Sequence, residues 1–268
     1  MTAQFPNPIP GPLQPPSNKP FFKWLTYLVL LPLFALSTTF FGCVSLICSL
    51  WDKSGRQQHV IAQTWAKSLL IITLSPVEVI GRGNLDPATP AVYVSNHLSY
   101  MDTPVLFAKL PFQFRILAKQ QLWKVPFIGW HLNRSGQVPV DQTTSRSAIS
   151  SLGRGVAALK ASLPLLLFPE GGRSPEGHAQ PFLSGAAWMA IRAQAPIVPV
   201  ALVGTYELMP MHTYTLHPRP LKVIFGHPIP TTGLTTKDAD ALTQRLYAEV
   251  STMYYEHSTL DRPSPATT

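Results

Sequence analysis

A buried strand and a histidine–aspartate pair meet in one short stretch of the chain, residues 92–102, VYVSNHLSYMD. Val92 and Val94 alternate with other residues, as is typical of a β-strand, and the polar run that follows predicts that the strand ends before His97. A histidine with a carboxylate five residues later can act as a general base oriented by the acid. This stretch therefore predicts a strand of a sheet and a candidate catalytic pair, His97 and Asp102.

The spacing of His97 and Asp102 limits where the next helix can begin. Five residues at about 100° per residue leave two side chains roughly 140° apart on one helix, so the pair cannot meet if both lie within it. We expect His97 in the turn before the helix and Asp102 in or just before its first turn. Ser99–Asp102 also fits a capping box, in which Asp102 would only start the helix, although Pro104 lacks an N–H that such a cap would use.

The composition favours a membrane-associated protein with anionic ligands. The 268 residues suffice for one sizeable core; 13% of them are charged, 46% are hydrophobic, and the formal net charge is +8. A basic and apolar chain suits an anionic membrane surface or phosphorylated ligands. Nucleic acid is not expected, because no dense Lys/Arg run is interleaved with aromatic residues. The two cysteines, Cys43 and Cys48, lie in an apolar run and predict neither a disulfide framework nor a zinc site.

The N-terminal part of the chain divides into a tail and a candidate membrane region. Residues 1–20 contain seven prolines, which predicts a disordered, Pro-rich tail. No residue from 24 to 51 is charged, and a helix of that length would reach roughly 40 Å, more than the ~30 Å hydrocarbon core of a bilayer. Pro32 and the cluster Ser37–Thr39 could divide it into a hairpin in one leaflet, with a tilted single span as the alternative. We expect residues 21–75 to form a membrane-associated helical region.

Residues 76–257 carry the pattern of an α/β domain. Apolar strand segments alternate with helical patterns, which is typical of a central sheet that helices mostly cover. Residues 258–268 are predicted to be a disordered tail. The predicted strands are 77–81, 91–95, 114–118, 164–168, 197–203 and 221–226, and the predicted helices are 57–75, 103–110, 146–162 and 183–194.

A second chemical stretch follows the strand predicted at 164–168. It reads PEGGRS, residues 169–174, and glycines at the C-terminal end of a sheet strand let backbone N–H groups face a ligand. Arg173 could hold a phosphate through two hydrogen bonds; an ordinary Pro-Gly turn with a surface arginine is the alternative. Lys119, at the end of another predicted strand, could also bind phosphate or could simply be solvated.

Four motifs occur in the order seen in glycerolipid acyltransferases. They are Asn96-His97-x4-Asp102, Gly136-x-Val138-Pro139-Val140-Asp141, Phe168-Pro169-Glu170-Gly171-Gly172-Arg173-Ser174 and Ile197-Val198-Pro199-Val200. From about Val77 to Pro230 the chain resembles the lysophosphatidic acid acyltransferases (1-acylglycerol-3-phosphate O-acyltransferases). Gly172 stands where that family often has Thr, and Gln142 where it often has Arg.

The resemblance implies a fold, a reaction and a site. The fold is a single α/β domain of the glycerolipid-acyltransferase type, preceded by an apolar membrane-associated helical segment. The reaction moves a fatty acyl group from acyl-CoA or acyl-carrier protein to the sn-2 hydroxyl of 1-acylglycerol-3-phosphate, giving phosphatidic acid. His97 would be the general base and Asp102 would orient it. The implied substrate-binding residues are Lys119 and Arg173 for the phosphate, Gly171 and Gly172 beside it, and Glu170, which would order the loop or contact the glycerol.

The resemblance also implies partners and a location. We expect membrane lipids, a lysophospholipid acceptor and acyl-CoA or acyl-carrier protein as partners, and no cofactor, metal or nucleic acid. The protein should be membrane-associated, with its active site facing the cytoplasm. The alternatives are an acyltransferase or transacylase acting on another lysolipid, such as lysophosphatidylglycerol or a lyso-aminolipid, and a catalytically silent lipid-binding protein. Intact His97 and Asp102 argue against a silent protein.

Overall fold

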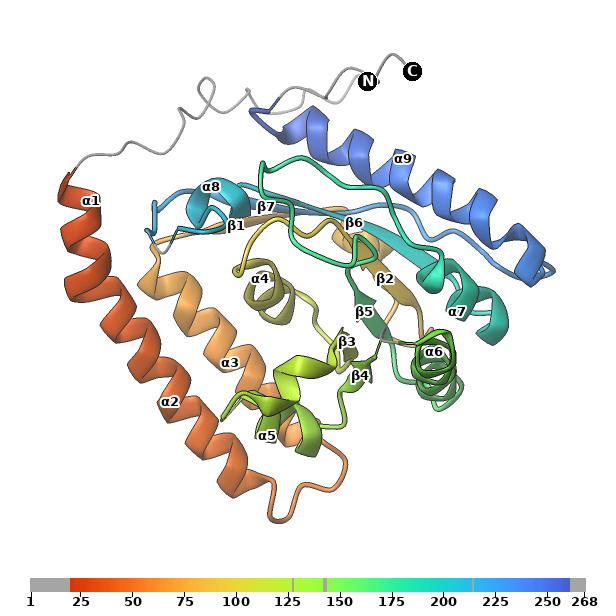
Figure 1. Ribbon diagram of the computed structural model, residues 1–268, viewed down its shortest axis with the longest axis horizontal. Coiled ribbons are helices and arrows are strands. Elements are labelled where there is room, and N and C mark those ends of the chain that lie inside the picture. The colour runs from red at the N-terminus through yellow and green to blue at the C-terminus, as the bar shows by residue number, and fades with distance from the viewer. Residues whose placement is uncertain (1–19, 127, 142–143, 214, 261–268) are drawn as a thin grey trace.

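A seven-stranded sheet forms the centre of the protein, with strand order β1-β7-β6-β2-β5-β3-β4 (Figure 1). The computed structural model describes residues 20–126, 128–141, 144–213 and 215–260, so the predicted tails lie almost wholly outside the described residues. The strands are β1 (Val77–Ile80), β2 (Val92–Ser95), β3 (Arg115–Lys119), β4 (Val138–Val140), β5 (Leu165–Leu167), β6 (Ile197–Val203) and β7 (Leu221–Phe225).

The sheet is mixed, and its parallel part places the chemical stretches side by side. β6, β2, β5, β3 and β4 run parallel to one another, whereas β7 pairs antiparallel with β6 and parallel with β1. Val94 of β2 lies opposite Leu167 of β5. Because both strands end at the same edge of the sheet, the segments that follow them meet there.

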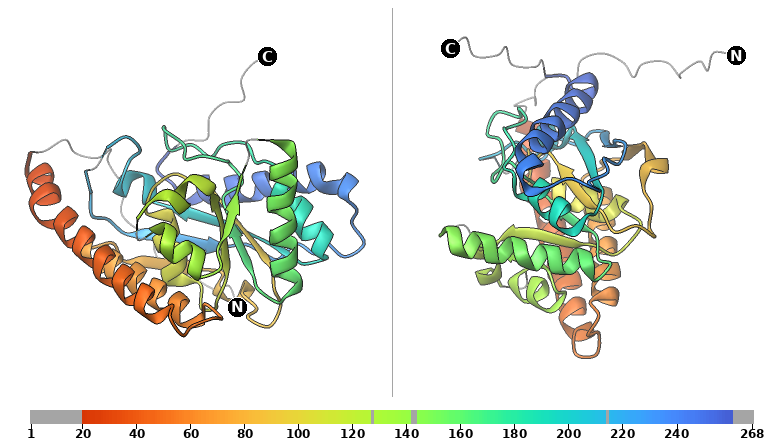
Figure 2. Two further views of the ribbon diagram at one scale, coloured as in Figure 1. Left: turned by 60° about the horizontal axis from the view of Figure 1, so that its bottom comes forward. Right: turned by 90° about the vertical axis from the view of Figure 1, so that its right-hand side faces the viewer.

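Helices cover both faces of the sheet, as predicted for an α/β domain. Side chains alternate along the central strands: Tyr93 and Leu166 join a core with α3 and α4, whereas Val94 and Leu165 join a core with α6, α7 and α9 (Figure 2). The longer helices are α2 (Leu31–Cys48), α3 (Arg56–Ile72), α4 (Asp102–Lys109), α5 (Ile128–Arg134), α6 (Ser145–Lys160), α7 (Gly185–Ala193) and α9 (Ala239–His257), with the short α1 (Pro20–Leu25) and α8 (Thr205–Leu208).

The apolar N-terminal segment is one continuous helix, so the division into a hairpin that the sequence left open does not occur. α1, the π-helical turn η1 (Thr26–Leu30) and α2 follow one another directly. By length and composition the part from Phe21 to Cys48 could cross a membrane. Pro32 lies in the first turn of α2, directly after the π-helical turn, where a missing N–H is tolerated.

The cluster Ser37–Thr39 does not break α2 because two of its hydroxyls find partners on α3. Ser37 Oγ lies 2.6 Å from Ser68 Oγ, and the Trp65 Nε1–H group donates to Thr38 Oγ1 over 3.1 Å. α2 and α3 instead pack against each other as a helical hairpin, which we call the N-terminal hairpin. It leaves large apolar side chains of α2 exposed, Leu36 by 67% among them, a surface consistent with membrane association.

The turn after β1 gives a test of this packing. Gly81 has a left-handed backbone (φ 72°), and a Cβ there would overlap the carbonyl oxygen of Phe225 on β7. We expect Gly81→Ala to lower the free energy of unfolding by about 2 kcal/mol or more, measured by denaturant titration. Gly83→Ala is the matched control, because a Cβ at Gly83 meets no atom within 4 Å. Equal unfolding midpoints for the two variants would contradict the packing of β1 on β7.

Candidate active site

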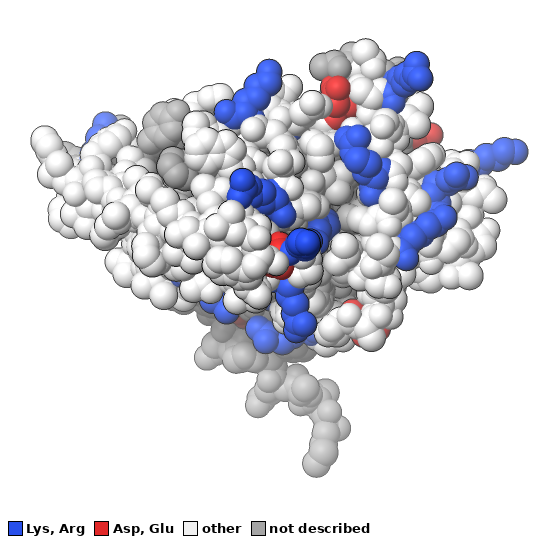
Figure 3. Space-filling model, turned by 90° about the horizontal axis from the view of Figure 1, so that it is seen from below, with Lys and Arg blue, Asp and Glu red and all other residues white. Residues whose placement is uncertain are grey.

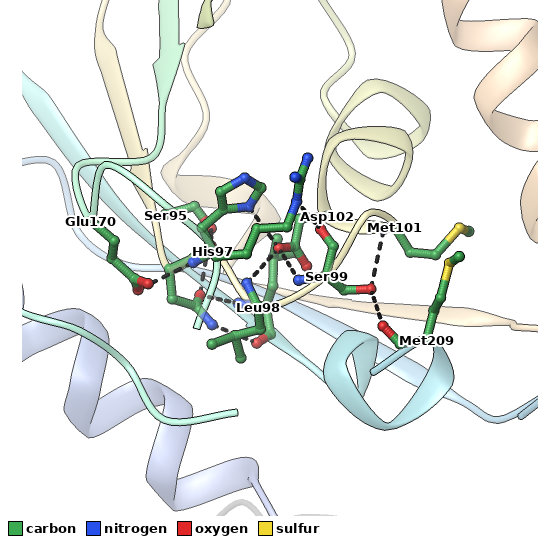
Figure 4. A network of polar contacts seen from close by, with 11 residues as sticks. Ser95, His97, Leu98, Ser99, Met101, Asp102, Glu170 and Met209 are labelled. Atoms are coloured by element: carbon green, nitrogen blue, oxygen red, sulfur yellow. Dashed lines mark hydrogen bonds and ion pairs between the residues drawn. The ribbon is translucent and has the colours of Figure 1, made fainter. Parts of the chain in front are cut away.

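His97 and Asp102 come together at the end of β2, in the arrangement that their spacing predicted. β2 ends at Ser95 and α4 begins with Asp102. The turn between them brings His97 Nδ1 to 2.9 Å from Asp102 Oδ2 (Figure 4). The Asp102 side chain is fully buried, whereas the His97 side chain is 12% exposed. The carboxylate is therefore shielded from solvent while the imidazole can reach a ligand.

Asp102 also organises the turn that carries the histidine. Its Oδ2 accepts hydrogen bonds from the backbone N–H groups of Leu98 (2.7 Å) and Ser99 (2.8 Å). In return, the Met101 N–H donates to Ser99 Oγ over 3.2 Å. The capping box is therefore incomplete, because the N-cap of α4 is Met101 and carries no side-chain cap, whereas the orienting role of Asp102 fits the geometry. With the carboxylate at Nδ1, the favoured neutral tautomer of His97 carries its proton on Nδ1 and leaves Nε2 as an acceptor.

Residues on or next to β5 and β6, the two neighbours of β2, contact this turn. The His97 ring stacks on Phe168, directly after β5, with ring centroids 4.0 Å apart and an interplanar angle of 14°. Asn96 is fully buried and exchanges two hydrogen bonds with the backbone of Leu202 on β6, over 2.9 and 2.8 Å. The position of the imidazole is therefore determined by three adjacent strands, β5, β2 and β6.

Glu170 lies behind the histidine and contacts its backbone. The His97 N–H donates to Glu170 Oε1 over 3.1 Å, and the Ser174 N–H donates to the His97 carbonyl over 2.9 Å. Burial raises the pKa of Glu170 to about 9, so this carboxyl is neutral at pH 7. Of the two roles considered for Glu170, this geometry favours ordering the loop over contacting the glycerol.

Arg173 is oriented by the same turn. Its Nε donates to the Ser99 carbonyl over 3.2 Å, and its guanidinium lies 4.2 Å from the centroid of the Tyr100 ring. Burial lowers the pKa of Arg173, while the nearby Asp102 carboxylate acts in the opposite direction. Within the described part of the chain, these contacts leave both terminal guanidinium nitrogens available to bind an anion.

Ser99 connects the two functional groups. Its N–H donates to Asp102, its carbonyl accepts from Arg173, and its hydroxyl donates to the Met209 carbonyl over 2.9 Å. Figure 4 shows Ser99 between Asp102 and Met209. The orientations of the general-base pair and of the anion-binding arginine therefore depend on one residue, which the sequence analysis considered only as part of a capping box.

Tyrosines hold the loop that follows Arg173, and none of them was predicted. Three of the four lie on α9, a helix that the sequence pattern did not reveal, so only the folded chain shows their role. Tyr254 Oη donates to the Gly177 carbonyl (2.7 Å), Tyr206 Oη to the Pro175 carbonyl (3.2 Å) and Tyr247 Oη to the Ala179 carbonyl (3.4 Å), while the Ala179 N–H donates to Tyr255 Oη (3.3 Å).

His97 lines a cavity of about 440 Å³, a size typical of small-ligand sites. Four of the five predicted substrate-binding residues line it as well: Lys119, Gly171, Gly172 and Arg173. A Cβ at Gly172 would meet no atom within 4 Å, so the backbone there is open to a ligand. Glu170 is the exception, and Gln142 lies outside the described residues.

The cavity extends from the histidine to the N-terminal hairpin. α2 and α3 contribute Phe41, Ile61 and Trp65 to its wall, which is largely apolar. A polar contact also lies there, because Ser45 Oγ of α2 is 2.7 Å from His131 Nδ1 of α5. Burial lowers the pKa of His131 to about 4, so this ring is neutral at pH 7. In the described ranges no group of three or more His, Cys, Asp or Glu residues could hold a metal ion.

Comparisons with known proteins show which proteins this chain resembles. The acyltransferase family model matches residues 76–203. A chloroplastic 1-acyl-sn-glycerol-3-phosphate acyltransferase of Brassica napus is 36% identical over 163 residues, which make up 60% of this chain and 47% of that protein. A 1-acyl-sn-glycerol-3-phosphate acyltransferase of Chlamydomonas reinhardtii is 33% identical over 225 residues, or 83% of this chain and 64% of that protein. The chain thus matches about half to just under two thirds of the length of these relatives.

A solved structure shares the fold. The crystal structure of the 1-acyl-sn-glycerophosphate (LPA) acyltransferase PlsC from Thermotoga maritima superimposes with a TM-score of 0.74, at 24% sequence identity. The match covers 88% of this chain and 97% of that one. The similarity extends beyond residues 76–203, and together with the sequence relatives it confirms the resemblance inferred from the four motifs.

The buried carboxyl of Glu170 predicts a pH-dependent difference in stability. The ordinary pKa of a glutamate is 4.5, and the pKa of Glu170 in the folded protein is about 9. Between these two pH values the unfolded chain loses the proton that the folded protein keeps. The free energy of unfolding therefore falls as the pH rises through this range. We expect Glu170→Gln, which keeps an oxygen for the His97 N–H, to be more stable than the wild type at pH 8 and to lose this advantage towards pH 5. Denaturant titrations at both values test this, and a stability difference independent of pH would contradict it.

Proposed function

We propose that the chain is an acyltransferase that acylates the sn-2 hydroxyl of 1-acylglycerol-3-phosphate to give phosphatidic acid; the match of residues 76–203 to the acyltransferase family model supports this. One observation carries the proposal: a carboxylate-oriented histidine faces a largely apolar cavity that also contains an arginine open to an anion. The names of the two relatives support it, since both are 1-acyl-sn-glycerol-3-phosphate acyltransferases. The donor would be acyl-CoA or acyl-carrier protein.

In this proposal the acceptor hydroxyl is the nucleophile. Nε2 of neutral His97 takes the hydroxyl proton as the oxygen attacks the thioester carbonyl. Asp102 stabilises the imidazolium that forms. When the tetrahedral intermediate collapses, the carbon–sulfur bond breaks and the imidazolium returns the proton to the departing thiolate. No acyl-enzyme intermediate is required, because the lipid itself supplies the attacking oxygen.

The acceptor phosphate would bind beside the histidine. Arg173 would supply two parallel N–H groups from its terminal nitrogens, and Lys119, which is exposed at the end of β3 and lines the cavity, would add a second cation. The open backbone at Gly172 would let the phosphate approach closely. The apolar wall formed by α2 and α3 would accommodate an acyl chain.

Membrane association would serve the same reaction. Each buried CH₂ group is worth about 0.8 kcal/mol, so withdrawing a long acyl chain into water is costly. The exposed apolar surface of α2 would place the cavity at a leaflet, where the acceptor already resides. We place the active site on the cytoplasmic side because the thioester donors are found there.

A second candidate acceptor follows from Gly172. The open space at this residue, where the family often has Thr, would admit a headgroup larger than phosphate alone. The same chemistry on another lysolipid, such as lysophosphatidylglycerol or a lyso-aminolipid, is therefore the alternative function.

The catalytic pair is tested by turnover. We expect solubilised wild-type protein given palmitoyl-CoA and a lysolipid panel to form phosphatidic acid, with release of the CoA thiol. His97→Ala should lower kcat by a factor of about 10² to 10⁴, and Asp102→Asn should lower it because the imidazole loses its orienting charge. Vesicle flotation and circular dichroism should be unchanged. If His97→Ala keeps wild-type turnover, or if no acceptor reacts with acyl-CoA or acyl-carrier protein, the proposed mechanism is wrong.

The acceptor site is tested by the split between KM and kcat. Arg173→Ala should raise the acceptor KM by tenfold or more. Tyr254→Phe, which removes the hydroxyl that donates to the Gly177 carbonyl, should raise it by about three- to tenfold with little effect on the donor KM. Tyr93→Phe is the control, since Tyr93 is a buried tyrosine of β2 that packs on the opposite face of the sheet from α9. Equal acceptor KM values for the two tyrosine variants would exclude a role of α9 in positioning the loop.

A further inference from the structure

An exposed apolar surface lies outside the N-terminal hairpin. The short 3-10 helix η3 (Gln120–Lys124) and α5 carry large apolar side chains that are more than a third exposed. Such side chains, gathered within ten residues of the chain, indicate an interaction surface. We call this surface the η3–α5 patch; it consists of Leu122 (37% exposed), Val125 (39%), Ile128 (43%) and Trp130 (51%).

Polar contacts attach the patch to the N-terminal hairpin. His131 of α5 contacts Ser45 of α2 over 2.7 Å, and Arg134 Nη1 donates to Ser49 Oγ, just after α2, over 2.6 Å. Gln58 of α3 donates to the Arg134 carbonyl over 3.2 Å. These contacts attach α5, and with it the patch, to the end of α2 and the start of α3.

The patch also borders the cavity. Leu122 and Ile128 line the cavity and are partly exposed, so they lie at its opening. Phe41 and Ser45 of α2 line the same cavity. The cavity wall therefore includes residues of both α2 and the η3–α5 patch.

The surrounding charge is complementary to anionic lipid. The chain has no Asp or Glu before Asp52 and none from Thr103 to Val140, a range with five Lys or Arg residues. Figure 3 views the face on which α5 lies: it is largely uncharged on the side of α2, and across its middle and right Lys and Arg predominate over Asp and Glu. Basic side chains next to exposed apolar ones suit the interface of an anionic leaflet.

We infer that the η3–α5 patch inserts into the interface of an anionic leaflet beside α2, so that lipid surrounds the cavity opening on both sides. The partner is the leaflet itself. The inference rests on the membrane association in the proposed function and adds a second contact to it. An acceptor could then enter the cavity laterally, without its acyl chain crossing water.

The patch can be tested on the full-length chain without an activity assay. Val125→Cys is made in a background of Cys43→Ser and Cys48→Ser and labelled with an environment-sensitive fluorophore. Val125 does not line the cavity. The matched control is Asp240→Cys, an exposed position on α9, and this helix lies on the opposite side of the molecule from α5 (Figure 1). Both proteins are bound to phosphatidylcholine–phosphatidylglycerol vesicles with and without nitroxide lipids, and binding is measured separately by flotation.

We expect quenching at position 125 to be at least threefold stronger than at position 240, and Lys124→Glu to reduce the quenching at 125. If the protein floats but both labels are quenched equally or not at all, the patch does not face the leaflet and the inference is wrong. If the protein does not float, the membrane association in the proposed function is also wrong. Turnover of a soluble short-chain acceptor still tests the acyltransferase chemistry separately.

Discussion

Three hydrogen bonds converge on one atom, Oδ2 of Asp102, and the active site depends on them. They come from His97 Nδ1 and from the backbone N–H groups of Leu98 and Ser99. In a fully buried environment such charge-assisted hydrogen bonds are strong and leave little freedom of geometry. The same atom therefore closes the turn after β2 and orients the imidazole. The carbonyl of Ser99 extends this arrangement to Arg173.

The fold brings distant parts of the chain to this turn. β2 and β5 are parallel neighbours, so the histidine stretch and the PEGGRS stretch leave the sheet at the same edge. Glu170 and Phe168 contact His97 from β5's side, and tyrosines of α9 hold the loop beyond Arg173. On the other side of the cavity, α2 and α3 form a largely apolar wall. A charged reaction centre and a lipid-compatible wall thus share one cavity.

Much of this could be predicted from the sequence, because short-range patterns encode it. Alternating apolar residues revealed six of the seven strands, and helical geometry placed His97 before α4 and Asp102 at its start. β4 was missed because three residues are too few for a periodicity. α9 was also missed, and the role of its tyrosines could not be predicted because they contact a loop 68 to 77 residues earlier in the chain. The continuity of α2 through Ser37–Thr39 depends on partners from α3, which no local pattern contains.

The tautomer of His97 tests the central role of Asp102 most directly. Nitrogen-15 NMR of histidine-labelled protein, assigned by comparison with His97→Gln, distinguishes a proton on Nδ1 from one on Nε2. If Asp102 orients the imidazole for proton abstraction, neutral His97 should carry its proton on Nδ1, and Asp102→Asn should reduce that preference. A His97 that carries its proton mainly on Nε2 in the wild type could not accept the acceptor's proton there, and the proposed mechanism would be contradicted.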